Sequence, residues 1–134
     1  GADLVIMTAA VADYTPEKKE DHKIKKGEET LTLRLKRTPD IISVIKKESD
    51  VPVIGFAAES DHVLEYAGEK LKKKGLALIV ANDITQKEGG FRSDFNHCYL
   101  ITPEKTRELE RMTKREVARH LAQEIIALFK NKDR

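Results

Sequence analysis

Cysteine is nearly absent from this chain of 134 residues, in which Cys98 is the single cysteine. One cysteine excludes an intrachain disulfide and a cysteine-rich zinc site, and it is typical of a reducing compartment, which favours the cytoplasm. No apolar run approaches the roughly 20 residues that span a bilayer, so we expect no membrane segment. Strong charge of one sign is also missing, because 25 basic and 23 acidic residues leave a formal net charge of +2. That balance excludes a protein that binds nucleic acid mainly through phosphates.

The sequence also lacks the common fingerprints of nucleotide and metal sites. It contains no Gly-x-Gly-x-x-Gly turn and no Walker loop, the two usual phosphate-binding motifs. Its four histidines follow no metal-ligand spacing, and none is spaced to form a catalytic pair with Cys98. The metal ligands are therefore unknown from the sequence, and Cys98 is interpreted as a residue that fills the core.

Short apolar runs that alternate with helical segments predict an α/β fold. The runs have the length of strands that are buried on both faces, as in a parallel sheet. They lie at residues 4–8, 51–57 and 76–81, and a fourth strand, near a sheet edge, is expected at 97–102. We therefore predict a Rossmann-like, mainly parallel sheet flanked by helices. The length suffices for one such domain, which would span residues 1–134.

The boundaries of three helices are indicated by capping signals. Thr38 can cap a helix that has Pro39 at its first position, where proline is favoured. A second helix should end at Gly75, because glycine is the preferred residue just after a helix. Thr113 and Glu116 have the spacing of a capping box at the start of a terminal helix.

One segment breaks the alternation of strands and helices. Leu31, Leu33 and Leu35 alternate with polar residues between positions 29 and 36, which predicts a strand with one apolar face. We interpret residues 15–37 as a flap and dimerisation segment, a strand-containing excursion from the sheet, because an apolar strand face needs a partner.

Three of the predicted strands end in small or polar residues. These ends lie at residues 8–10, 55–59 and 81–83, and in open α/β sheets ligands bind at the carboxyl ends of parallel strands. Small side chains let a ligand approach the backbone, and Phe56 offers a flat face to a planar group. For any single alanine, packing beneath a helix is an equally good interpretation. The recurrence of such residues at one sheet edge predicts a ligand site there.

Lysines near these strand ends favour an anionic ligand. Lys23, Lys25 and Lys26 lie in a polar loop, and Lys70 and Lys74 are four residues apart on one helical face. A lysine on a loop could cover phosphates after binding and stabilise the charge that builds in phosphoryl or nucleotidyl transfer. Either group of lysines could instead be a solvated surface.

Two aspartates near the strand ends have several possible roles. Asp13 and Asp83 could ligate magnesium or accept a hydrogen bond from a ribose hydroxyl. Each could equally be a turn residue or a helix cap. The sequence alone does not choose between these roles.

Five motifs in a fixed order resemble one known family. They are Ala9-Ala10-Val11-Ala12-Asp13-Tyr14, Lys23-Ile24-Lys25-Lys26, Pro39-Asp40-Ile41, Gly55-Phe56-Ala57-Ala58-Glu59 and Ala81-Asn82-Asp83-Ile84. Together they closely resemble the phosphopantothenate-cysteine ligase domain of the bacterial bifunctional coenzyme A biosynthesis flavoprotein. The resemblance runs over almost the whole chain but covers only the later part of that ligase domain. Because the chain begins almost directly with a sheet-interior strand, we expect a preceding strand and helix to be missing from it.

The resemblance implies a ligase of coenzyme A biosynthesis and pantothenate metabolism. In that reaction the carboxylate of 4'-phosphopantothenate attacks CTP to give an acyl-cytidylate, and cysteine then displaces CMP to give 4'-phosphopantothenoylcysteine. Mg2+ would bridge the phosphates of CTP. Spacing alone does not distinguish CTP from ATP. Such an enzyme is expected to be a cytoplasmic homodimer through the flap strand, fused to or paired with a flavin-dependent decarboxylase domain.

The resemblance also implies roles for individual residues. Lys23 would be the catalytic residue and would bind the nucleotide, while Asn82 and Asp83 would contact substrate. The other nucleotide-binding residues would be Met7, Ala9, Ala10, Asp13, Pro39, Asp40, Ile41, Ile42, Phe56, Lys70 and Lys74.

Two alternatives to an active ligase are kept. One is a non-catalytic nucleotide-binding or dimerisation fragment of that enzyme, because loss of a preceding strand and helix would remove part of the site. The other is a fragment of a dinucleotide-dependent oxidoreductase, against which the missing glycine fingerprint argues.

Overall fold

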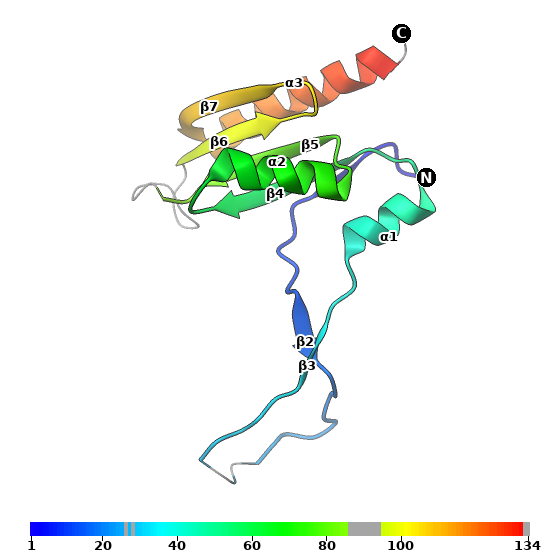
Figure 1. The fold of residues 1–134 in the computed structure, drawn as a ribbon, viewed down its shortest axis with the longest axis vertical. Helices are drawn as coiled ribbons and strands as arrows, with labels where there is room; N and C mark the ends of the chain where they lie inside the picture. Colours follow the sequence, from blue (N-terminus) through cyan, green and yellow to red (C-terminus); the bar gives the residue numbers. More distant parts are fainter. Residues whose placement is uncertain (26, 28, 86–94, 133–134) are drawn as a thin grey trace.

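The computed structural model of the chain describes residues 1–25, 27, 29–85 and 95–132 (Figure 1). The strands are β1 (Val5–Met7), β2 (Tyr14–Pro16), β3 (Leu35–Arg37), β4 (Val53–Glu59), β5 (Leu78–Asp83), β6 (Phe95–Ile101) and β7 (Thr106–Thr113). The helices are α1 (Ile41–Glu48), α2 (Val63–Lys74) and α3 (Lys114–Lys132). Five strands form the main sheet in the order β1-β4-β5-β6-β7, and β2 and β3 form a separate pair.

The main sheet is mixed. β1, β4 and β5 pair in parallel, whereas β5 with β6 and β6 with β7 pair antiparallel. The Rossmann-like α/β prediction is confirmed, but the sheet is not mainly parallel. A tight turn joins β6 to β7, in which the Thr102 amide donates to the Lys105 carbonyl over 2.8 Å, and so short a connection can join only antiparallel strands. Sequence analysis missed β7 because half of its residues are charged and only Leu109 in it is buried.

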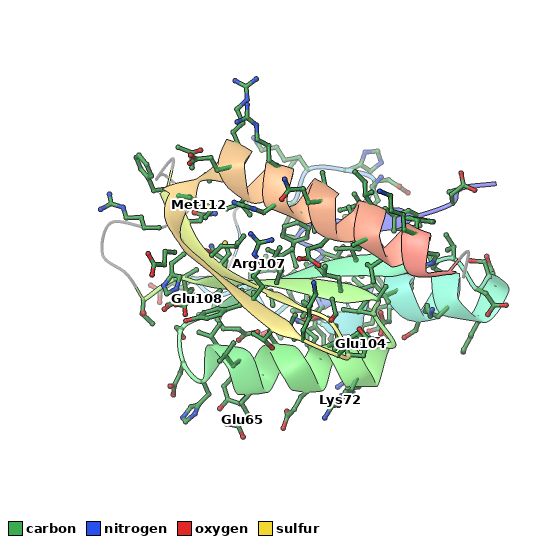
Figure 2. The ribbon with its side chains drawn as sticks, turned by 90° about the horizontal axis from the view of Figure 1, so that it is seen from above. Glu65, Lys72, Glu104, Arg107, Glu108 and Met112 are labelled. Carbon is green, nitrogen blue, oxygen red and sulfur yellow. The ribbon has the colours of Figure 1, made fainter. Side chains whose placement is uncertain are left out.

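Helices cover both faces of the main sheet, with α2 and α3 on opposite sides (Figure 2). On one face Val53 and Ile79 pack with residues of α2. On the other face Ile54, Leu78 and Val80 pack with residues of α3. The two sets alternate along β4 and β5, as the two-residue period of a strand requires. None of the helices in the described part of the chain is long and apolar enough to cross a membrane.

Two sets of polar contacts attach α3 to the β6–β7 hairpin. At its start the predicted capping box is present, because the Glu116 amide donates to the Thr113 hydroxyl over 3.2 Å and the Thr113 amide donates to the Glu116 carboxylate over 2.8 Å. Further along, the Glu124 carboxylate lies 2.8 Å from the Lys105 ammonium and 3.5 Å from the guanidinium of Arg107. Figure 2 shows Arg107 between β7 and α3. The hydrogen bond from Lys105 is the main reason that the pKa of the buried Glu124 lies below its ordinary value.

Glu124 is expected to make the stability of the domain depend on pH. Its pKa is lowered by folding, so its ion pairs stabilise the fold above the pKa of an unfolded glutamate and lose this effect as the pH falls through the folded-state pKa. We expect Glu124→Gln to lower the free energy of unfolding by about 1–3 kcal/mol at pH 7 and by less at pH 3. Urea denaturation at both pH values measures the difference, with Glu104→Gln as an exposed control. An equal loss at the two pH values would contradict this role.

The segment predicted to be a flap, residues 15–37, is an extended excursion in its described part and projects from the main sheet (Figure 1). β2 and β3 pair antiparallel within it. The strand expected at residues 29–36 is confirmed only at its end, where β3 begins. Leu31, Leu33 and Leu35 are each more than half exposed in this chain. The predicted apolar residues are therefore present, but nothing within the described part of the same chain buries them.

Candidate functional site

A pocket of about 590 Å³ lies at the carboxyl end of β1 and the middle of β4, beside the start of α1 and the end of α2. It gathers most of the predicted site. The predicted residues in its lining are Met7, Ala9, Ala10, Asp13, Pro39, Asp40, Ile41, Ile42, Phe56, Lys70 and Lys74. Their contacts with a ligand stay predictions, but the chain does bring them together around one cavity.

Sequence analysis left several lining residues unassigned. These are Val11, Tyr14, Arg37, Thr38 and Gly55. Four of them lie within or directly beside one of the five motifs, so proximity in sequence was the available signal for these four, whereas Arg37 lies two residues before the nearest motif. The lining as a whole contains three cationic and two acidic side chains.

Strand pairing and a glycine shape the base of the pocket. Gly55 of β4 pairs with Met7 of β1, and a β-carbon at Gly55 would lie only 2.8 Å from Cδ1 of Leu76. A larger residue at position 55 would therefore push against the core beneath the pocket. The next side chain, Phe56, is 39% exposed and lines the cavity. Its ring is available to a planar group.

The start of α1 forms one wall of the pocket and is held by Asp40. The Asp40 carboxylate accepts hydrogen bonds from the Ser43 amide over 3.3 Å and from the Ser43 hydroxyl over 2.7 Å. It also pairs with Lys74 in the last turn of α2, and the hydrogen bond from Lys74 is the main reason that the pKa of Asp40 falls to about 2. The helix cap expected at Thr38 was wrong, because the Thr38 hydroxyl donates to the Ala12 carbonyl over 2.6 Å instead.

Two of the three cations in the pocket lack a carboxylate partner, among the described residues, of the kind that Lys74 has. Arg37 and Lys70 line the cavity and form no ion pair with another residue in the described ranges. Asp40 neutralises Lys74, whereas Asp13 has no ion-pair partner among these residues. The charged side chains of the lining that have no ion-pair partner among the described residues are therefore two cations and one carboxylate, and this excess of positive charge favours an anionic ligand over a cationic one.

Three predicted site residues lie outside the pocket lining. Lys23 lies between β2 and β3, in the flap. Asp83 ends β5, and its carboxylate accepts from the Thr85 amide over 2.9 Å and from the Thr85 hydroxyl over 2.6 Å. These bonds from Thr85 lower the pKa of Asp83. They are typical of an aspartate in a turn, one of the roles that the sequence left open for Asp83. The side-chain oxygen of Asn82 lies 3.6 Å from the sulfur of Cys98.

The described residues offer no clear metal site and no reactive cysteine. They contain no group of three or more histidine, cysteine, aspartate or glutamate side chains that could hold a metal ion. Cys98 is buried, and burial raises the pKa of its thiol to about 11, as suits a core residue rather than a nucleophile. Lys26, part of the predicted lysine loop, lies outside the described residues.

Comparison with known proteins shows the family. The family model described as the DNA/pantothenate metabolism flavoprotein C-terminal domain matches residues 1–129. The chain belongs to this family. Curated relatives include the coenzyme A biosynthesis bifunctional protein CoaBC of Bacillus subtilis, which is 44% identical over 131 residues, and that of Escherichia coli K12, which is 37% identical over 138 residues. A cysteine/cysteine sulfinic acid decarboxylase from an unknown prokaryotic organism is 35% identical over 132 residues.

These matches cover nearly all of the chain but only part of each relative. The match to the Bacillus subtilis protein covers 96% of this chain and 32% of that protein. The corresponding shares are 98% of this chain and 34% of the Escherichia coli protein, and 94% of this chain and 36% of the decarboxylase. The chain thus spans about a third of the length of the curated relatives it matches.

Two solved structures share the fold. The C-terminal domain of a CoaBC protein is 34% identical with a TM-score of 0.73, and the match covers 96% of this chain and 56% of that one. The DNA/pantothenate metabolism flavoprotein from Streptococcus pneumoniae is 29% identical with a TM-score of 0.75, covering 94% of this chain and 63% of that one.

These findings correct the identification of the chain as a phosphopantothenate-cysteine ligase domain. The matched family is described as part of a flavoprotein, and the names above include a decarboxylase but no ligase. The predicted joining of 4'-phosphopantothenate to cysteine through an acyl-cytidylate was therefore wrong. The alternative, a nucleotide-binding or dimerisation fragment of that ligase, does not fit these findings either. Coenzyme A biosynthesis and pantothenate metabolism agree with the names of the family and its members.

The expected cofactors and partners are corrected for the same reason. A flavoprotein family points to a flavin rather than to CTP and Mg2+. 4'-Phosphopantothenate, cysteine and CTP are accordingly no longer assigned as ligase substrates. The geometry of the site also argues against CTP as its ligand, because Lys23, the residue expected to steady the phosphates of CTP, does not line the pocket. None of these comparisons concerns the expected homodimer.

Proposed function

We propose that this domain binds a phosphorylated ligand of coenzyme A biosynthesis in the pocket between β1, β4, α1 and α2. The observation that carries the proposal is the gathering of three cationic side chains and an exposed aromatic ring around one cavity. Two kinds of ligand suggested by the family description share the required phosphate group. They are flavin mononucleotide (FMN) and phosphorylated pantothenate derivatives such as 4'-phosphopantothenoylcysteine.

The dimensions and chemistry of the pocket support such a ligand. Its volume of about 590 Å³ lies within the range of roughly 300–1,000 Å³ that is typical of small-molecule sites. The small side chains of Ala9 and Ala10 leave the backbone accessible to a ligand. The Phe56 ring can pack against a planar group, and Lys70 can pair with a phosphate without breaking an existing ion pair. When bound, a flavin would supply redox chemistry, with Phe56 against its ring and Lys70 near its phosphate.

Calorimetric titration of the 134-residue chain tests the proposal. The ligands are FMN and 4'-phosphopantothenoylcysteine, each compared with its dephosphorylated form. We expect at least one phosphorylated ligand to bind roughly tenfold or more tightly than its counterpart, the effect of one charge-assisted hydrogen bond. Equal affinities within both pairs would refute the proposal. CTP with Mg2+ is the comparison ligand, and tighter binding of CTP than of either compound would contradict a pocket specific for a flavin or a phosphorylated pantothenate derivative.

The name of one relative favours a second candidate, a part in decarboxylation. Asp13 is the carboxylate of the lining that has no ion-pair partner among the described residues, so it is a carboxylate of the pocket that is available to interact with the substrate. Release of carbon dioxide from 4'-phosphopantothenoylcysteine, measured with FMN present, tests this candidate. Binding without release would restrict the role of this chain to holding the ligand.

We also keep the proposal that residues 15–37 form a flap and dimerisation segment. It is supported by the exposed leucines of the flap, among them Leu33 at 58% exposure. If these residues are buried between two chains, Leu33→Glu should shift the chain toward monomer, because a desolvated charge without a partner costs several kcal/mol. Sedimentation velocity measures the shift, and Thr32→Glu is the control for added charge. Identical profiles for wild type and Leu33→Glu would refute the role.

The proposed location is the cytoplasm. A single cysteine supports it, since Cys98 is buried and cannot form a disulfide within the chain. The participation in coenzyme A biosynthesis that the relatives' names indicate is consistent with this location.

A further inference from the structure

Arg37 lies where the flap joins the pocket. It is the last residue of β3 and is opposite Tyr14 of β2 in the ladder, and both residues line the cavity. Thr38 follows, and its hydroxyl donates to the Ala12 carbonyl over 2.6 Å while its amide donates to the Asp13 carbonyl over 2.9 Å. The backbone of Arg37 is therefore held on both sides, so its side chain extends from a fixed base.

The charges of the lining leave Arg37 available to a ligand. Lys74 is already paired with Asp40. Arg37 and Lys70 have no ion-pair partner in the described part of the chain, and they belong to different elements, β3 and α2. An anion that enters the pocket can therefore pair with both without displacing a carboxylate.

We propose that Arg37 is the residue that recognises the phosphate group of the ligand. This inference rests on the proposed function and specifies it. A guanidinium presents a planar pair of N–H donors that matches two phosphate oxygens, whereas an ammonium acts as a point charge. Arg37 thus supplies directional recognition from the flap side of the cavity, and Lys70 supplies positive charge from α2. Discrimination between phosphorylated and dephosphorylated ligands is its specific contribution.

The ratio of affinities for the phosphorylated and dephosphorylated forms tests this role. It is measured by calorimetry for FMN against riboflavin and for 4'-phosphopantothenoylcysteine against pantothenoylcysteine, which separates the two sources of the phosphate. We expect Arg37→Gln to remove most of the preference, reducing the ratio by roughly tenfold or to near one, because it loses hydrogen bonds to a charged group. Arg37→Lys should restore only part of it, because the charge returns without the planar donor pair.

Arg34 provides the matched control. It lies three residues earlier in the same flap arm and lines a different cavity, formed within the flap, rather than the pocket. Arg34→Gln should therefore leave the ratio unchanged. Thermal unfolding of each variant shows whether the fold is intact.

The outcomes separate the inference from the proposed function. If the wild-type chain shows no preference for either phosphorylated ligand, the proposed function fails and the role of Arg37 fails with it. If the wild type shows the preference and folded Arg37→Gln keeps it, only the role of Arg37 is refuted. An equal reduction in Arg34→Gln and Arg37→Gln would also refute it, since it would indicate a general effect of positive charge on the flap.

Discussion

Replacing Lys70 with Glu is expected to weaken binding of phosphorylated ligands to the pocket by roughly 100-fold or more. Lys70 is one of two cations in the lining without an ion-pair partner in the described residues. The substitution removes that charge and adds a carboxylate to a lining that already contains Asp13 and Asp40. A glutamate at position 70 would also lie four residues before Lys74, a spacing that favours an ion pair within the helix. Both effects oppose the approach of a phosphate.

Matched variants make this result specific. Lys72 is on the same helix but points away from the sheet (Figure 2), so Lys72→Glu changes the net charge equally without changing the pocket. Lys70→Gln removes the positive charge without adding a negative one and should give an intermediate affinity. The affinities are measured by calorimetry at low and moderate salt, because long-range charge effects are screened by salt. Equal weakening by Lys72→Glu and Lys70→Glu would show that Lys70 does not contact the ligand.

Replacing Leu78 with Ala should lower the free energy of unfolding by about 2–5 kcal/mol, the usual effect of such a truncation in a well-packed core. Leu78 is fully buried at the start of β5 and pairs with Ile54 of the neighbouring strand. It packs on the face of the sheet covered by α3. The loss is large compared with the roughly 5–15 kcal/mol that stabilises a typical domain.

Urea denaturation measures this loss, and Leu64→Ala is the control. Leu64 is in α2 and is 48% exposed, so truncating it should cost less than about 1 kcal/mol. Leu78 does not line the pocket, and ligand affinity should persist in the fraction of Leu78→Ala that remains folded. A loss of less than 1 kcal/mol for Leu78→Ala would contradict its place in the core.

The resemblance found in the sequence indicated the biosynthetic context but not the reaction. Three of its five motifs, at residues 9–14, 39–41 and 55–59, contribute residues to the lining of the pocket. Such positions determine the shape of a site, and a fold can hold different chemistries in similar sites. The predicted context, coenzyme A biosynthesis, therefore agrees with the comparisons, whereas the predicted ligase reaction is contradicted by the match to a flavoprotein family.

Contacts between distant segments account for most other differences from the sequence predictions. Thr38 was expected to cap α1, but its hydroxyl is bonded to Ala12, so Asp40 takes the cap position. Asp40 also meets Lys74, which is 34 residues away along the chain. No local pattern reports such a pair, because helix capping rules consider only residues that are close in sequence. Arg37 was missed for the same reason, since its relation to the pocket depends on pairing with β2.

Local sequence patterns by themselves determined the buried strands, the end of α2 at Gly75 and the capping box at Thr113 and Glu116. Each depends on neighbours within a few residues, through apolar runs, left-handed backbone geometry or a reciprocal hydrogen bond. The tertiary structure alone decided the antiparallel half of the sheet, the limited pairing in the flap and the assembly of the charged pocket. These features depend on which segments meet in space, and that is set by the packing of the whole chain rather than by any one stretch of it.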